Sequence, residues 1–153
     1  MTDRPTDPRL HRRLLDSLYV DAMLLADEAR GYFDQGGRQE REALDPLTRV
    51  TFSCESLKVT TRLMHIIAWL LTQRAVQAGE LSPREALDPA RRLGASPATE
   101  PATHDAMPAQ ARALIAGSID LHRRVARLEE AMLSPDTAPS PARSMQARLS
   151  SAF

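Results

Sequence analysis

The sequence predicts an all-α protein, an elongated antiparallel three-helix bundle with a short helix in the second connection and a disordered C-terminal tail. Apolar residues recur at spacings of three and four over three long segments, which is the period of a helix with one buried face. Prolines and glycines fall between these segments, and no alternating pattern typical of a strand occurs. The chain therefore divides into a flexible N-terminus at 1–7, a bundle at 8–133 and a disordered tail at 134–153.

The first helix is predicted at about 8–35. Asp7 can cap it, proline suits its first turn, and Gly36-Gly37 stops it. Its predicted core stripe comprises Leu14, Leu15, Leu18, Ala22, Leu25, Ala29, Tyr32 and Phe33.

The second helix is predicted at about 46–78, from the Asp45-Pro46 cap to Gly79. Its residues at alternating spacings of four and three form a heptad seam, which is typical of a helix packed nearly antiparallel against others. We expect this seam to face the core, and with it the single cysteine of the chain, Cys54. The seam comprises Val50, Cys54, Leu57, Thr61, Met64, Ala68, Leu71 and Ala75.

The connection at 80–107 contains a capping-box pattern, Ser82-Pro83-Arg84-Glu85, which predicts a short helix that ends at Gly94. The third long helix is predicted at about 108–133. After it, the chain is rich in serine and proline and has little to bury, so it cannot offset the cost of ordering its backbone. We therefore expect 134–153 to be disordered. The seam of the third helix comprises Ala111, Leu114, Ser118, Leu121, Val125, Leu128 and Met132.

The second helix carries apolar residues on more than one side. If Met64 and Ala68 face the core, then Ile66 and Trp69 point away from it. A contiguous exposed apolar patch usually marks an interface. The sequence thus predicts a homodimer or partner surface, and its alternative is that 80–107 folds over these residues within one chain. The candidate surface comprises Val20, Met23, Leu24, Val59, Arg62, Ile66, Trp69, Leu70 and Gln73.

The charge balance gives no general attraction to nucleic acid or to anionic lipid, because 20 basic and 20 acidic residues cancel. The N-terminus lacks the apolar region of a signal peptide. The longest apolar run, Ile66 to Leu71, is far shorter than the ~20 residues of a membrane span. We expect a cytoplasmic protein with no membrane and no nucleic-acid partner.

No pattern in the sequence predicts catalysis, a cofactor or a metal. The four histidines, His11, His65, His104 and His122, have no partner at metal-ligand spacing, and no glycine-rich phosphate loop occurs. Asp21 is expected to form a structural ion pair with Lys58 or Arg62 of the second helix. These features predict a protein that is not an enzyme.

Several segments of the second helix resemble the RcdA family, alphaproteobacterial regulators of CtrA degradation. They are Glu55-Ser56-Leu57, the run from Thr60 to Met64, Trp69-Leu70-Leu71 and the run from Gln73 to Glu80. The resemblance implies an antiparallel three-helix bundle that forms a homodimer and ends in a disordered tail. It also implies a non-enzymatic adaptor that helps to deliver cell-cycle regulators to the ClpXP protease, with a single-domain response regulator as a partner.

Three function hypotheses follow from the residues and the resemblance together. The first is an adaptor in regulated proteolysis that contacts the protease unfoldase, a response regulator and protein substrates. The second is a structural or scaffolding dimer that binds another protein, and the third is a transcriptional regulator. A flexible tail can make transient contacts, for which the candidates are Ser134, Arg143, Arg148 and Phe153.

Overall fold

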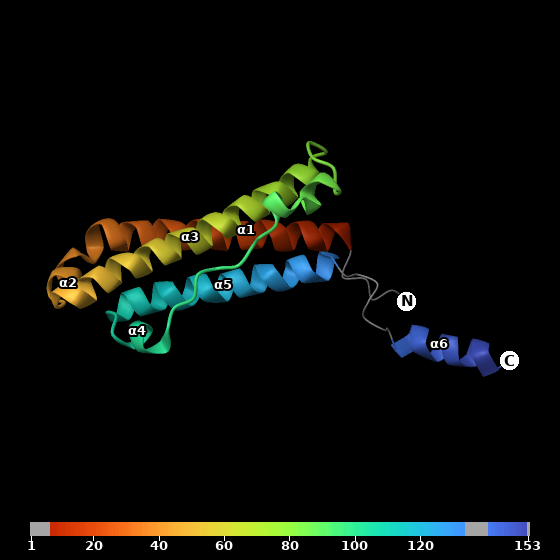
Figure 1. The fold of residues 1–153 in the computed structure, drawn as a ribbon. Coiled ribbons are helices and arrows are strands. Elements are labelled where there is room, and N and C mark those ends of the chain that lie inside the picture. Colours follow the sequence, from red (N-terminus) through yellow and green to blue (C-terminus); the bar gives the residue numbers. More distant parts are fainter. Residues whose placement is uncertain (1–6, 134–140, 153) are drawn as a thin grey trace.

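The computed structural model describes residues 7–133 and 141–152, and all regular structure in these ranges is helical. Three long helices form a bundle (Figure 1): α1 (Pro8–Gly31), α3 (Pro46–Gln77) and α5 (Ala109–Leu133). The predicted all-α class is confirmed. None of the helices described is long and apolar enough to cross a membrane.

The direction of α5 corrects the expected antiparallel order. Figure 1 shows α1 antiparallel to both other long helices, whereas α3 and α5 run in the same direction. Side-chain contacts agree, since Arg62 of α3 bonds to Ser118 of α5, and Trp69 farther along α3 lies with Met132 farther along α5. This parallel order arises because the connection between α3 and α5 is long enough to carry the chain back along the bundle.

Caps at the predicted positions fix the starts of α1 and α3. The Asp7 carboxylate accepts a hydrogen bond from the Arg9 amide at 3.0 Å, and Asp45 accepts from the Thr48 amide at 3.2 Å. The bonds from Thr48 lower the pKa of Asp45 below its ordinary value. At the other end of α3, Gly79 has a φ of 76°, a conformation that favours glycine.

The turn between α1 and α3 contains structure that the sequence did not predict. A π-helical turn (Tyr32–Gly36) continues α1, and the short α2 (Arg38–Glu42) follows it. A Cβ atom at Gly37 would lie 2.8 Å from the ring of Tyr32, so only glycine fits beside this buried ring. Gly37 therefore permits the close packing of Tyr32 in this turn.

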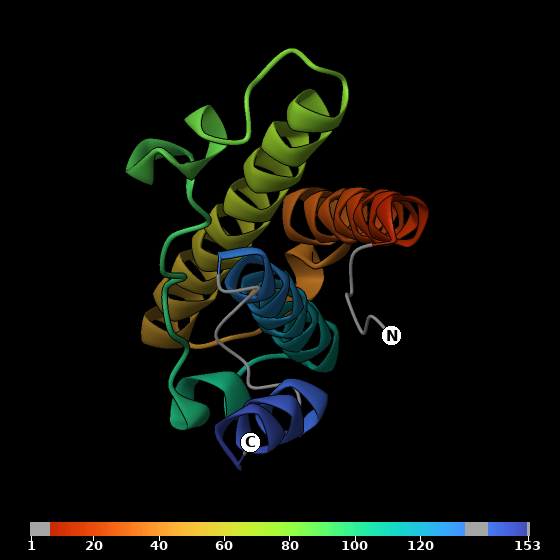
Figure 2. The ribbon, with the colours of Figure 1, turned by 90° about the vertical axis from the view of Figure 1, so that its right-hand side faces the viewer.

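The connection at 80–107, here called the strap, runs along the bundle beside α3 and α5 (Figures 1 and 2). The predicted capping box forms: Ser82 Oγ accepts from the Glu85 amide at 3.0 Å, and Glu85 Oε1 accepts from the Ser82 amide at 3.4 Å. Two short 3₁₀ turns (Glu85–Leu87 and Pro89–Arg91) replace the predicted helix, because Pro89 removes an amide donor. The strap then contains α4 (Pro101–Asp105) before α5 begins.

Where the sequence predicts a disordered tail, the structure has the helix α6 (Pro141–Ala152). It stands apart from the three-helix bundle in Figure 1, and each of its side chains that the structure describes is exposed. The tail positions 134–140 and 153 lie outside the described residues.

Candidate protein-interaction surface

The structure reverses the orientation that the sequence predicted for α3. Ile66 and Trp69 are 0% and 3% exposed, so they lie inside a single chain rather than on its back. Trp69 faces residues of the strap, among them Pro83 and Ala86. This agrees with the alternative prediction, in which 80–107 folds over Ile66 and Trp69 within one chain. Six residues of the predicted partner surface are therefore core residues in this structure: Val59, Arg62, Ile66, Trp69, Leu70 and Gln73.

The predicted core seam of α3 is instead the exposed side of the helix. Leu57 and Met64 are 67% and 64% exposed, and Cys54, expected inside, is exposed. Together with Leu47, which continues the heptad spacing, these residues define the α3 stripe. Most of them are exposed, and Thr61 is half-buried. The α3 stripe comprises Leu47, Val50, Cys54, Leu57, Thr61, Met64, Ala68 and Leu71.

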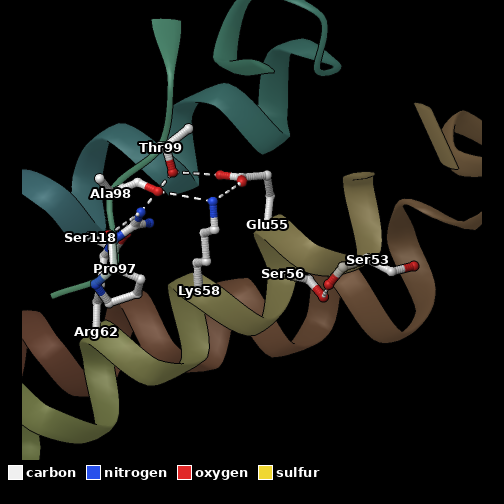
Figure 3. Close-up of polar contacts among 9 residues, drawn as sticks. All are labelled: Ser53, Glu55, Ser56, Lys58, Arg62, Pro97, Ala98, Thr99 and Ser118. Carbon is white, nitrogen blue, oxygen red and sulfur yellow. Dashed lines mark hydrogen bonds and ion pairs between the residues drawn. The ribbon is translucent and has the colours of Figure 1, made fainter. Parts of the chain in front are cut away.

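A buried polar cluster explains why the helix turns this way. The guanidinium of Arg62 donates to the Pro97 carbonyl at 2.9 and 3.2 Å, to Thr99 Oγ1 at 2.7 Å and to Ser118 Oγ at 3.2 Å (Figure 3). Since Pro97 and Thr99 belong to the strap and Ser118 to α5, one side chain joins three elements. We call this cluster the strap clasp.

Glu55 completes the strap clasp and balances its charge. Its carboxylate accepts from Thr99 Oγ1 and pairs with Lys58 Nζ at 2.9 Å (Figure 3). Lys58 also donates to the Ala98 carbonyl at 2.9 Å. Burial lowers the pKa of Arg62 from its ordinary value, and the charge of Glu55 opposes that shift. A buried charge with these partners is tolerated, whereas an unpaired one is costly.

The expected ion pair of Asp21 is different in the structure. Asp21 lies 3.7 Å from Arg124 of α5, and both side chains are about half-exposed. Lys58 and Arg62, its predicted partners, are engaged in the strap clasp. The Asp21 pair is therefore a surface contact, which contributes little to stability.

Three of the predicted surface residues do lie on the outside of α1. Val20, Met23 and Leu24 are exposed and line a shallow depression of about 430 Å³. Tyr19, Ala26, Asp27 and Arg30 complete its lining. We call Val20, Met23 and Leu24 the α1 patch.

The structure describes only two of the four predicted tail-contact residues. Ser134 and Phe153 lie outside the described residues. Arg143 and Arg148 are both in α6, and the side chain of Arg148 is exposed.

Among the described residues, no group of three or more His, Cys, Asp or Glu side chains is placed to hold a metal ion. The structure distinguishes His122 from the other histidines, which the sequence did not. His122 is buried on α5, and its Nε2 atom has no hydrogen-bond partner. Burial lowers its pKa below the usual value, and the positive charges of His65 and Arg62 act in the same direction.

Comparisons with known proteins identify relatives of this architecture. The family model DUF1465, described as a protein of unknown function, matches residues 6–153. The crystal structure of RcdA from Caulobacter crescentus CB15 is similar, with 31% sequence identity and a TM-score of 0.65. That match covers 78% of this chain and 90% of the RcdA chain. No curated protein matches.

Proposed function

The chain belongs to the DUF1465 family of RcdA-like proteins, and on this premise we propose that it is a non-enzymatic adaptor that acts through protein–protein contacts. The observation that carries the proposal is the α3 stripe, an apolar heptad seam on the outside of a complete bundle. Exposed contiguous apolar surface of this kind is typical of an interface. A heptad seam in particular suits another helix, because knobs at every third and fourth residue fit the holes of a facing helix.

We propose that a second copy of the chain occupies the α3 stripe. The residues at one heptad position are small, except the first: Leu47, Cys54, Thr61 and Ala68. The residues at the other heptad position are large: Val50, Leu57, Met64 and Leu71. Parallel pairing places small residues against small ones, which leaves gaps. Antiparallel pairing places each small residue opposite a large one and fills the seam evenly.

The ends of the α3 stripe set the register of such a dimer. Antiparallel pairing over its whole length brings Leu47 opposite Leu71 of the second copy, and Cys54 opposite Met64. At the centre, Leu57 meets Thr61. The two Cys54 residues are then ten positions apart along the seam, about 15 Å at ~1.5 Å per residue. This is too far for a disulfide.

Burial of apolar side chains is the main contribution that favours association. Burying a large side chain contributes about 1.5–3 kcal/mol when it starts fully exposed, and Val50, Leu57, Met64 and Leu71 start about half to two-thirds exposed. The eight such residues of a dimer contribute roughly 7–14 kcal/mol. Association costs roughly 4–15 kcal/mol, so a dimer at micromolar concentration requires a cost near the lower end of that range.

The proposed activity is assistance in delivering cell-cycle regulators to an AAA+ protease of the ClpXP type. Family resemblance supports this step, with the unfoldase, a response regulator and protein substrates as the proposed partners. The tail, including Arg143 and Arg148, would supply a transient contact. The alternative is a scaffolding dimer that binds another protein without the protease.

Sedimentation tests the surface on which the proposal depends. The double variant Leu57→Glu, Met64→Glu should sediment as a monomer at micromolar concentration, since it places charges at the centre of the seam. Ala113→Glu, Ala116→Glu, on the exposed side of α5, is the matched control and should still dimerise. A wild-type chain that is monomeric at high micromolar concentration contradicts the dimer.

Cross-linking tests the antiparallel register. In a Cys54→Ser background, Leu57→Cys with Thr61→Cys should form an intermolecular disulfide under mild oxidation, whereas the wild-type chain should not link through Cys54. A wild-type chain that links through Cys54 under the same conditions indicates parallel pairing and contradicts the proposed register.

Capture of the ClpX-type unfoldase tests the adaptor role. The full chain should retain the purified unfoldase together with a substrate, and a chain that ends at Leu133 should lose it. Retention of neither protein by a dimeric full chain contradicts the adaptor and leaves the scaffold.

A further inference from the structure

The apolar side of α6 has no cover in the structure. Met145 and Leu149 are 66% and 54% exposed and lie four residues apart, so they project from the same side of the helix. Ala142 and Ala152 continue this spacing. A helix of 12 residues is marginal in water without a surface to pack against. The pattern is that of a helix that docks through one side.

The bundle offers two exposed apolar surfaces to such a helix, the α3 stripe and the α1 patch. Both have the spacing of a helix face. The α1 patch borders the depression of about 430 Å³, which can receive the two large side chains of α6. Both surfaces are apolar, so hydrophobicity alone does not decide which of them α6 binds.

The two surfaces differ in the charges that surround them. The segment Pro141–Ala152 contains two arginines and no acidic residue. The only acidic residue of α3 is Glu55, which is buried in the strap clasp. The α3 stripe therefore offers no carboxylate to α6.

The second half of α1 is acidic. It carries Asp21, Asp27 and Glu28 against the single base Arg30, and both Asp27 and Arg30 line the depression. Within the described part of the chain, no ion pair involves Asp27 or Glu28. The first half of α1, by contrast, is rich in arginine. Complementary charge thus directs α6 to the α1 patch.

The chain is long enough for this contact. Seven residues, 134–140, separate the end of α5 from α6, and at ~3.3–3.6 Å per residue they allow a span of about 26–29 Å. The end of α5 lies beside the start of α1 in Figure 1. The α1 patch begins twelve residues along α1 from Pro8, about 18 Å at ~1.5 Å per residue.

From these observations we propose that α6 docks on the α1 patch of its own chain, with Met145 and Leu149 against Met23 and Leu24 and with Arg148 near Asp27. The short tether gives α6 an effective concentration of order millimolar at the patch. A contact through only two large side chains is therefore enough to populate the docked state. This surface is separate from the α3 stripe, so the adaptor proposal stands or falls independently of it.

Amide hydrogen exchange in the full-length chain tests the docking. Docked α6 should exchange at least about 10-fold more slowly than a free helix of its length, because isolated short helices are mostly open. Met145→Gln, Leu149→Gln should remove this protection. The control Ala147→Gln, Ser151→Gln changes the opposite side of α6 without adding charge and should keep it.

Variants of the bundle locate the docking surface. Met23→Gln, Leu24→Gln should abolish the protection of α6, whereas Met64→Gln, Leu71→Gln in the α3 stripe should leave it unchanged. Arg148→Glu should weaken the protection, and Asp27→Arg in the same chain should restore it. Urea unfolding of each variant verifies that the bundle is intact.

Three results overturn the proposal. The first is an α6 that exchanges as an unprotected segment in the wild-type chain. The second is protection that the α3 variant removes and the α1 variant does not. The third is protection that disappears on dilution below the dimer dissociation constant, which would place α6 on a second copy. Sedimentation of the Leu57→Glu, Met64→Glu variant is unaffected by any of these results, so the two proposals fail separately.

Discussion

The two sides of α3 make the most instructive comparison in this protein. Both carry apolar residues over the whole helix, yet one is sealed inside the bundle and the other faces solvent. The inner side carries the bulkiest residues, Phe52 and Trp69, together with the charged pair Glu55 and Arg62. The outer side has the more regular heptad spacing but smaller residues. In this helix the bulkiest residues therefore mark the core, and regular heptad spacing does not.

Hydrogen-bond partners explain how the inner side accommodates charge. Arg62 and Glu55 are tolerated because the strap brings carbonyl and hydroxyl groups to them. The strap can do so because it runs the length of the bundle and lets α5 lie parallel to α3. The strap clasp and the parallel order are thus two aspects of the same arrangement.

The largest effect that sharpens this comparison is expected at Arg62. Arg62→Ala removes the positive charge that offsets buried Glu55 and leaves the Pro97 carbonyl without its donor, and it should lower the free energy of unfolding by about 3–5 kcal/mol. Arg62→Lys should recover only part of this, because an ammonium cannot reproduce the fork of donors. Arg84→Ala, an exposed arginine of the strap, is the control. Urea unfolding measures all three, and a loss below about 1 kcal/mol for Arg62→Ala contradicts the role of the strap clasp.

Two residues on opposite sides of α3, Ile66 and Met64, test the orientation of the helix directly. Ile66→Ala removes a fully buried side chain and should cost about 2–5 kcal/mol of unfolding free energy. Met64→Ala, two positions earlier, should change monomer stability by no more than about 0.5 kcal/mol but weaken self-association. Thermal unfolding at low protein concentration separates these effects. Equal losses for the two variants mean that α3 is not oriented as described.

A smaller effect is expected at the strap side of the clasp. Thr99→Val is close in volume but removes the hydroxyl that accepts from Arg62 and donates to Glu55. The loss should be about 1–3 kcal/mol, and exchange of amides in the strap should accelerate with it. Thr103→Val, also half-buried in the strap, is the matched control. Unchanged strap exchange in Thr99→Val argues that the backbone carbonyl bonds of Arg62 suffice.

The sequence predicted the fold class and the inner faces of α1 and α5 well. Leu15, Leu18, Ala111 and Leu114, all in predicted seams, are buried. Leu14 and Met132, at the outer ends of these predicted seams, are exposed.

The orientation of α3 could not be derived in the same way, because two apolar sides compete for the core. With Met64 and Ala68 taken as the core side, Arg62 fell on the outside. Its hydrogen-bond partners lie 35–56 residues away, and no local pattern reveals them. The available signal was bulk: Phe52, Ile66 and Trp69 fall on one side. The residues of α3 that were predicted to be exposed are consequently buried. The parallel order of α5 was missed because the length of the strap was attributed to a loop.

The smallest expected effect concerns His122, which lies close to the strap clasp. Burial and the nearby charges of His65 and Arg62 hold its pKa below the ordinary ~6.5 of histidine, although Glu129 and the Gly94 backbone act in the opposite direction. Between pH ~6.5 and the lower folded pKa, the unfolded chain binds a proton that the folded chain does not. Stability should therefore fall as the pH decreases through this window and be unaffected by this group at higher pH.

His122→Gln should flatten that dependence, because it cannot take up the proton. The urea midpoints at about pH 7.5 and about pH 5.5 should differ less in this variant than in the wild-type chain, and His104→Gln should behave as wild type. If the variant and the wild type lose the same stability on acidification, then titration of other groups, such as the exposed carboxylates of α1, controls the response. The clasped side of α3 would then be insensitive to pH in this range.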